Sequence, residues 1–163
     1  MKNPAEEIVT AWLQECKGYF TMNNIKVPKA KGGMGAEIDI LGTDAQGNNI
    51  WVEVLVSTNP RRNFRKGILF KKTIEGALKD FKREDKRKKV AKYFKNKYEM
   101  WLVYGRLPLK EEDVKLFPEE LLRHKVKPIS FFGEIFKDML NLKGFRLDAG
   151  RGYMNLFKTF HEP

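Results

Sequence analysis

The order of apolar and polar residues predicts a helix followed by paired strands. Apolar residues between positions 4 and 20 recur about every 3.6 residues, which is typical of a helix packed on one face. Residues 36–41 and 50–57 alternate with a period of two and are rich in β-branched side chains. The polar, glycine-containing stretch 42–49 separates them. We therefore expect these two strands to form a hairpin.

The rest of the chain continues as alternating helices and strands. The spacing after the break at Pro60 predicts a buried helix stripe of Ile68, Leu69, Ile74, Leu78 and Phe81, and Val90, Tyr93 and Phe94 continue an apolar face. The remaining predicted elements are a strand at 24–28, a strand at 99–105, a helix at 111–124 interrupted by Pro118, a strand at 126–132 and a helix at 134–142.

The strands joined by a hairpin thus come first, and the strands that are connected through helices come later. The predicted order is α-β-β-β-α-β-α-β-α, which favours an α/β fold with a mixed sheet and helices on both faces. We expect a single domain over residues 1–143. Residues 144–163 are expected to form a C-terminal tail that docks on the domain or contacts another subunit.

The positive charge of the chain is concentrated in one segment. The net charge is +11 over 163 residues, and residues 61–97 hold 16 Lys and Arg against 4 Asp and Glu. The rest of the chain is therefore close to neutral. A basic helix face exposed to water would explain such a segment, but a polyanionic partner explains it better, because each cation that neutralises a phosphate releases condensed counterions. We favour nucleic acid over an anionic membrane or an acidic protein.

Several classes of protein are disfavoured by composition. No apolar run approaches the roughly 20 residues that span a bilayer, and the first residues do not resemble a secretory signal. A cytoplasmic protein without membrane association is therefore expected. Cys16 is the single cysteine, and His124 and His161 lie far apart in sequence, so a disulfide, a zinc cluster and a Ser-His-Asp triad are poorly supported.

Glu53 is an acid within an otherwise apolar strand. Strand alternation places it on one face with Trp51 and Leu55. Sheet packing does not require a carboxylate there, and burying one unpaired is costly. A chemical role for Glu53 is therefore worth considering.

Asp39 is predicted to meet Glu53 across the hairpin. Asp39 shares a face with Glu37, whereas Ile38 and Ile40 take the other face. Two carboxylates at one point repel unless a cation lies between them, and Mg²⁺ (or Mn²⁺) prefers hard oxygen ligands. The alternative is that each acid is a surface charge or the partner of a lysine. The two together, beside a basic segment, favour a metal site.

These residues resemble a known family. Glu6 in the first helix, the run GAEIDIL at 35–41 and the run WVEV at 51–54 resemble the PD-(D/E)xK nuclease superfamily, most of all the branch that contains Holliday-junction resolvases. The resemblance covers roughly residues 4–105. It implies a restriction-endonuclease-like fold with an αβββαβ core and a Mg²⁺-dependent DNA endonuclease. It also implies Asp39 and Glu53 as metal ligands, a helix glutamate as helper (Glu6 rather than Glu7), and a homodimer.

The chain departs from this family at one position. The family has a lysine two residues after the second acid, and here that residue is Leu55. Either another cation reaches the same space or the domain is a DNA-binding module that has lost catalysis. Lys29, Lys31, Lys71 and Lys72 are the candidates considered, and Lys31 is favoured as the catalytic replacement.

Cations near the proposed site are expected to bind the phosphate backbone of DNA. These are Arg61, Arg62, Arg65, Lys66, Lys71 and Lys72. Residues 82–89 are interpreted as a water-exposed helix face with Glu84–Lys88 and Asp85–Lys89 pairs. The three tryptophans are expected in the core. An RNA-binding or RNA-processing domain is a third interpretation, which competition between duplex DNA, branched DNA and RNA would test.

Overall fold

The computed structural model of the protein describes residues 3–29, 31–32, 35–56 and 69–142. Five strands form a single sheet in the order β1-β2-β3-β4-β5. The strands are β1 (Phe20–Val27), β2 (Ala36–Thr43), β3 (Asn49–Leu55), β4 (Glu99–Tyr104) and β5 (Val126–Ser130). The first three pair antiparallel, whereas β4 and β5 run parallel to β3. The predicted mixed sheet is confirmed.

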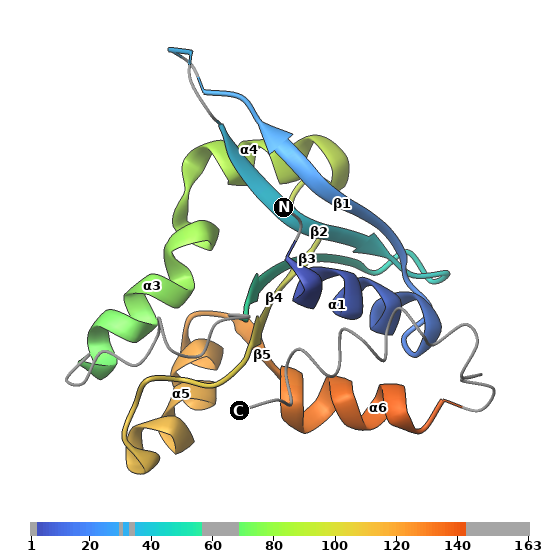
Figure 1. Cartoon of the computed structure of the whole chain (residues 1–163). Helices are drawn as coiled ribbons and strands as arrows, with labels where there is room; N and C mark the ends of the chain where they lie inside the picture. Colours follow the sequence, from blue (N-terminus) through green and yellow to red (C-terminus); the bar gives the residue numbers. More distant parts are fainter. Residues whose placement is uncertain (1–2, 30, 33–34, 57–68, 143–163) are drawn as a thin grey trace.

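Helices cover both faces of this sheet (Figure 1). One face carries α1 (Pro4–Glu15), the short π-helix η1 (Phe131–Ile135) and α6 (Phe136–Leu140). The other carries α3 (Phe70–Lys82), α4 (Glu84–Phe94) and α5 (Glu111–Arg123). This is the α/β architecture expected of a restriction-endonuclease-like fold.

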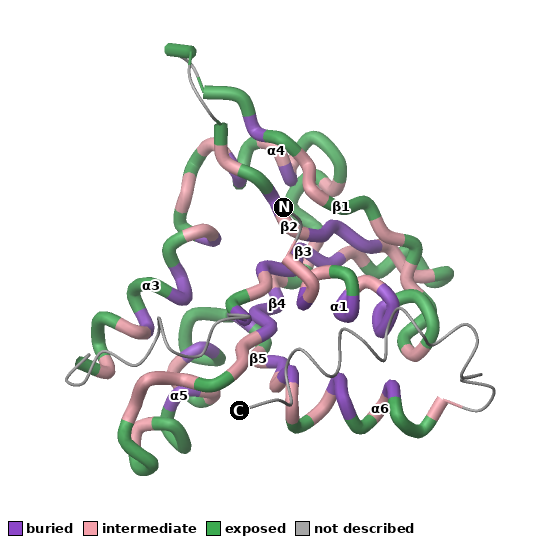
Figure 2. Tube along the Cα trace, viewed as in Figure 1, coloured by how far each residue is buried: buried purple, intermediate pink, exposed green. Residues whose placement is uncertain are grey.

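Each helical layer packs on its own apolar cluster. The buried residues follow the sheet and the inner sides of the helices (Figure 2). Trp12 and Trp101 belong to the α1 cluster, and Trp51 belongs to the cluster beneath α3, α4 and α5. All three tryptophans are buried, as predicted. The sheet therefore separates two apolar cores, and each side chain of β3 faces one of them.

The first helix ends earlier than the sequence pattern predicts. Asn3 caps its N-terminus by accepting a hydrogen bond from the Ala5 N–H, and the helix ends at Glu15 rather than near residue 20. Gly18 has φ of 72°, a conformation that glycine adopts without strain, and it turns the chain into β1. Phe20, expected on the buried stripe, begins β1 and is 75% exposed.

Two predicted helices also have different boundaries. The basic segment forms two helices that meet at Arg83, whose extended backbone (ψ of 121°) ends α3. Of the predicted stripe, Ile74, Leu78 and Phe81 are buried on α3, whereas Leu69 is 65% exposed before the helix begins and Ile68 lies outside the described residues. On α4, Val90 is buried but Tyr93 is 45% exposed. In contrast to the prediction, α5 runs through Pro118, because Phe117 and Leu121 bury its inner face.

The strict alternation expected of β2 fails at Asp39. Ile40 packs in the α1 cluster, whereas Ile38 packs in the opposite cluster, so the two isoleucines do not share a face as predicted. On the neighbouring strand β1, Asn24 has φ of 52°. The pairing of β1 with β2 is interrupted there, between Asn23 and Ile25. The left-handed Asn24 distorts both strands at this level, so the β2 side chains before and after Asp39 no longer alternate regularly between the two faces of the sheet.

Some predictions fall outside the described residues. These are the cations Arg61, Arg62, Arg65 and Lys66, and the tail 144–163. Within the part that is described, no helix combines the length and apolar character needed to cross a bilayer.

Candidate active site

Glu53 lies in the buried middle of β3, and its carboxylate has polar and charged partners. Its side chain faces the cluster beneath α3, α4 and α5, and the residue is 5% exposed. The Trp51 Nε1–H donates to Glu53 Oε1 at 2.7 Å. The Lys86 Nζ lies 3.0 Å from Oε1 and 3.1 Å from Oε2. The acid that sheet packing does not require is thus held by an indole and an ammonium.

Lys86 reaches this acid from the first turn of α4 and is itself 3% exposed. Its Nζ also lies 2.9 Å from Asp80 Oδ1, in the last turn of α3. The Arg83 guanidinium binds Asp85 at 2.7 and 3.1 Å, and Asp85 Oδ1 accepts the Lys86 N–H at 2.8 Å. The corner between α3 and α4 therefore fixes the position of Lys86.

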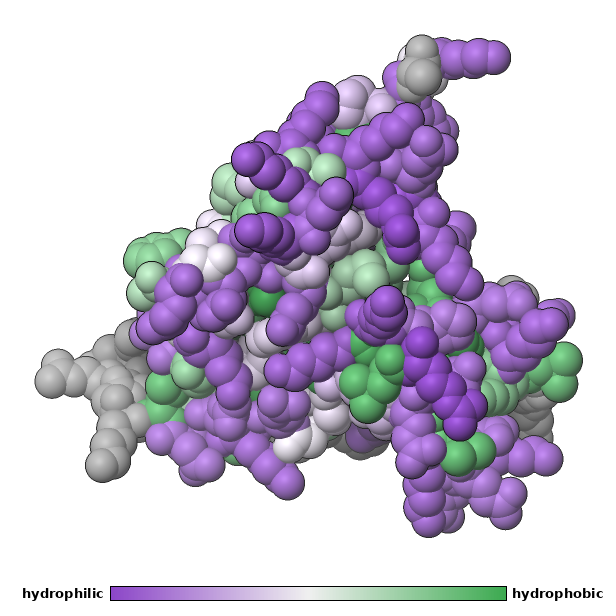
Figure 3. Space-filling view, turned by 180° about the vertical axis from the view of Figure 1, so that it is seen from behind, coloured by the Kyte–Doolittle hydropathy of each residue, from purple (hydrophilic) through white to green (hydrophobic). Residues whose placement is uncertain are grey.

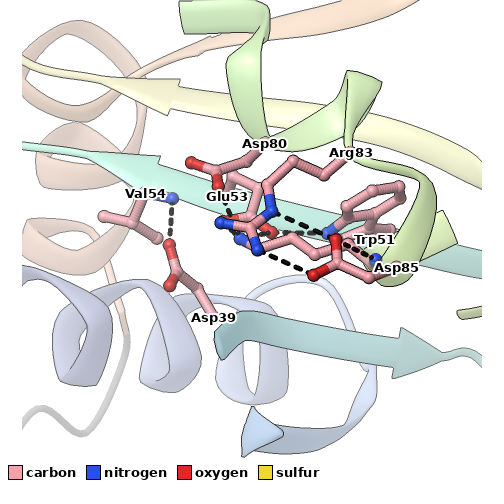
Figure 4. A network of polar contacts seen from close by, with 8 residues as sticks. Asp39, Trp51, Glu53, Val54, Asp80, Arg83 and Asp85 are labelled. Carbon is pink, nitrogen blue, oxygen red and sulfur yellow. Dashed lines mark hydrogen bonds and ion pairs between the residues drawn. The ribbon is translucent and has the colours of Figure 1, made fainter. Parts of the chain in front are cut away.

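Asp39 lies beside Glu53 where the β2–β3 ladder ends. The last backbone pair of that ladder is Ile40 with Val52. Beyond it, Asp39 Oδ2 accepts the Val54 N–H at 2.7 Å (Figure 4), so a side chain replaces the missing strand partner. This bond fixes the Asp39 carboxyl next to the residue that follows Glu53.

The environment favours protonated carboxyls. Burial raises the pKa of Asp39 to about 6, against the Val54 hydrogen bond, and the charge of Glu6 adds to the rise. Burial and the charge of Asp39 raise the pKa of Glu53 to about 8, although Lys86 acts in the opposite direction.

Lys86 keeps its proton. Burial by itself would lower its pKa, but the charges and hydrogen bonds of Glu53 and Asp80 outweigh burial and raise it. One ammonium faces the carboxyls of Asp39, Glu53 and Asp80, so the acids are in excess. A proton shared by Asp39 and Glu53 offsets that excess in the free protein. Asp39 and Glu53 can therefore both ionise only when further positive charge reaches the site.

Glu6, rather than Glu7, lies near this pair. Glu6 is half-buried on α1, its Oε2 accepts a hydrogen bond from Asn24 Nδ2 at 3.0 Å, and its charge acts on Asp39. Glu7 is exposed. The same left-handed Asn24 that distorts β1 thus anchors the helix glutamate beside the site.

The donor set fits a hard divalent cation that is completed by other oxygens. Among the residues that the structure describes, no group of three or more His, Cys, Asp or Glu side chains is arranged to hold a metal. Asp39 and Glu53 offer two carboxylates. Mg²⁺ is commonly held by one or two carboxylates, with waters and substrate phosphates in the other positions. The pair therefore fits Mg²⁺ or Mn²⁺ as a site shared with the substrate.

The lysine at the site is not the one that the sequence favoured. Lys31 is exposed in the turn between β1 and β2, whereas Lys86, 33 residues along the chain from Glu53, contacts the carboxylate. Lys86 stands four residues before Val90 on the buried side of α4. A lysine in the apolar stripe of a helix was the available sign, and the surrounding basic run obscured it.

Of the other predicted contacts, some are present in the structure and some are not. The Glu84–Lys88 pair is present at 3.0 Å, but Asp85 pairs with Arg83 rather than Lys89. Lys71 and Lys72 are both exposed on α3 and face different cavities. Lys72 lines a cavity at the end of β3, and Lys71 lines one beside α5.

Comparison with known proteins gives a likeness in structure alone. No family model and no curated protein matches the chain. AF1548, a protein of unknown function, has a similar structure with a TM-score of 0.52 and 15% identity, and the match covers 98% of this chain and 90% of that one. At this identity, the likeness supports the fold.

Two further structures are more distantly similar. A repair endonuclease from Pyrococcus abyssi gives a TM-score of 0.39 at 15% identity, and a complex of EndoMS with double-stranded DNA gives 0.29 at 14%. Each match covers 80% of this chain, which spans about half of those proteins, 47% and 46% of their lengths. The AF1548 match, which extends over nearly the whole of both chains, thus carries the comparison and supports the α/β fold described above.

Proposed function

We propose that this protein is a metal-dependent DNA endonuclease that hydrolyses phosphodiester bonds at the Asp39–Glu53 pair. The observation that supports this most is the position of half-buried Asp39 beside buried Glu53, with Lys86 on Glu53. Such an arrangement costs stability, because buried charges lose hydration that their partners only partly replace. Strongly perturbed acids in one place are typical of catalytic sites.

Asp39 and Glu53 are the residues that would hold Mg²⁺ or Mn²⁺. When bound, the metal ion supplies an acidified water and stabilises negative charge on the phosphate. Asp39 is held in place for this by the Val54 N–H, and Glu53 by Trp51. Glu6 adds negative charge beside Asp39 and is fixed by Asn24.

Lys86 supplies the cation that the chain lacks at Leu55. Its ammonium remains protonated within hydrogen-bond distance of Glu53, so it orients that carboxylate and offsets negative charge that develops on the phosphate. Lys71 and Lys72 bind the DNA backbone from α3, with Arg61, Arg62, Arg65 and Lys66 as further cations. A homodimer acting on DNA is part of the proposal.

Asp39→Asn tests the proposal most simply. The asparagine oxygen still accepts the Val54 N–H, so the fold is retained while a charged metal ligand is lost. We expect cleavage of supercoiled plasmid and of a four-way junction, with Mg²⁺ or Mn²⁺, to be abolished while DNA is still bound. Glu37→Gln on the same strand is the matched control, because Glu37 is exposed.

Two outcomes would contradict the proposal. Cleavage by Asp39→Asn at the wild-type rate would place the metal elsewhere. If the wild type binds DNA and cuts nothing across metals and substrates, the chain is a DNA-binding module on this fold, and Leu55 marks the loss of chemistry.

A further inference from the structure

A cavity of about 470 Å³ lies beside the end of β3, starting at the residue after Glu53. Its wall includes Val54, whose N–H holds Asp39, and one face of α3 up to Ala77. Asp80, which holds Lys86, follows one turn later on the same helix. The cavity and the carboxyl pair are therefore neighbours along both β3 and α3.

The cavity has an apolar lining and cationic side chains. Leu55 is 45% exposed at the end of β3, and Leu107 lies on the opposite wall after β4. Lys72 and Arg106 supply the positive charges, and the Arg106 guanidinium lies 5.7 Å from the Phe132 ring centroid. Elsewhere, hydrophilic residues cover most of the face seen in Figure 3, with small apolar areas between them. The cavity thus suits a flat apolar group that carries negative charge.

Thr73 in this wall has a hydroxyl group without a partner. Its Oγ1 is buried and is the one such side-chain atom without a hydrogen bond among the described residues. The carbonyl of Leu69, one turn earlier, already accepts the Thr73 N–H at 3.2 Å. The hydroxyl itself is closed to solvent, so it is a local cost of packing α3 against the sheet and does not face the cavity.

Gly76 in the same wall is not required by packing. It lies in the middle of α3, where glycine weakens a helix, yet a Cβ at this position would meet nothing within 4 Å. A side chain there would occupy the cavity. The glycine keeps the helix backbone open to close approach by a ligand.

We propose that this cavity binds one unpaired nucleotide of the DNA strand next to the bond that is cut. The base contacts Leu55, Leu107 and the backbone at Gly76, and Lys72 and Arg106 bind the adjacent phosphates. A paired base keeps its faces stacked in the duplex, so only an unpaired nucleotide enters. The inference rests on the proposed function and names its substrate class: DNA that contains an unpaired nucleotide.

The first test measures preference as a ratio. Affinities of the full chain for a duplex with a single-nucleotide bulge and for the fully paired duplex are compared by fluorescence anisotropy without divalent metal. We expect the wild type to bind the bulged DNA about tenfold more tightly, as one stacked base provides. Gly76→Leu adds a side chain whose Cβ meets no neighbouring atom within 4 Å, and by occupying the cavity it should bring the ratio close to one.

Matched variants separate this effect from general changes. Glu75→Leu places the same side chain on the neighbouring residue, which lines the other cavity, and should keep the wild-type ratio. Thr73→Val removes a hydroxyl that is closed to solvent, so it should lower neither the melting temperature of the free protein nor the preference for the bulged DNA.

Cleavage assays with Mg²⁺ then distinguish the two proposals. If the wild type cuts DNA and Gly76→Leu retains the tenfold preference, the cavity proposal fails and the nuclease stands. If no DNA is cut but Gly76→Leu abolishes a preference that the wild type has, the cavity stands and the nuclease fails. A wild type without preference for the bulge overturns the cavity proposal.

Discussion

Lys86 and Lys88 lie two residues apart on α4, and each forms an ion pair with a glutamate. The Lys88–Glu84 pair is open to water, with side chains 73% and 81% exposed. The Lys86–Glu53 pair is buried, with side chains 3% and 6% exposed, and joins α4 to the centre of the sheet. The same residue type is therefore a solubilising charge on one side of the helix and a component of the proposed site on the other.

The difference shows what burial does to a charge. An exposed pair is screened by water and contributes little to stability. A buried pair has lost its hydration, so either partner alone would be strongly destabilising. A protein keeps such a pair where the charges are used, and here they lie beside Asp39.

Unfolding experiments should give the largest contrast between the two lysines. Lys86→Ala removes a buried side chain and leaves Glu53 and Asp80 without their shared hydrogen-bond donor, so we expect the free energy of unfolding to fall by about 3 kcal/mol. Lys88→Ala should cost less than about 0.5 kcal/mol. Urea denaturation of both variants measures this, and equal losses would contradict the distinction.

The pH dependence of stability should separate the two glutamates. The pKa of Glu53 is raised from 4.5 to about 8, so the folded state holds a proton that the unfolded state releases above about pH 4.5. The contribution of Glu53 to stability is therefore complete below that pH and is lost as pH rises through about 8.

Relative to Glu53→Gln, the wild type should lose about 3 kcal/mol of unfolding free energy between pH 5 and pH 8. Thermal or urea unfolding across this range provides the measurement. Glu84→Gln, which removes the exposed pair, is the control and should keep the wild-type profile. Parallel profiles for wild type and Glu53→Gln would show that Glu53 is ionised in the folded protein throughout.

The smallest effect concerns DNA binding. Lys72 is exposed and available to a phosphate, whereas Lys86 is occupied by two carboxyls. Lys72→Gln should reduce the slope of log K against log salt by about 0.9, the value for one phosphate contact, and Lys86→Gln should leave it unchanged. Titration at several salt concentrations tests this, and the reverse order would exchange the two roles.

Much of the fold could be predicted from local pattern. The alternation in β3 and most of the stripe on α3 depend on which faces are buried, and burial leaves a period in the sequence. Helix ends and strand distortions were less accessible. Gly18 ends α1 through a left-handed conformation, and Asn24 distorts β1 in the same way, and neither conformation is visible as a period.

The carboxyls of the site were easier to anticipate than its cation. Asp39 and Glu53 interrupt apolar strands that are adjacent in a hairpin, so their proximity follows from pairing. Lys86 reaches Glu53 through the corner at Arg83, and that corner depends on how α3 and α4 pack on the sheet. Many residues of this segment are basic, so charge does not distinguish Lys86 from the others. Its place four residues before the buried Val90 does.

The proposed role of Lys86 in cleavage is tested most directly by comparing the Lys86→Met and Lys88→Met variants. Methionine keeps the volume of Lys86, and Glu53 can stay protonated beside it. With Mg²⁺, we predict that Lys86→Met cuts plasmid about 100- to 1,000-fold more slowly than wild type, and that Lys88→Met cuts within about twofold of it. Leu55→Lys in the Lys86→Met protein should restore part of the rate, because residue 55 follows Glu53 on the same strand face. Cleavage by Lys86→Met at the wild-type rate would contradict the proposal that Lys86 supplies the cation of the active site.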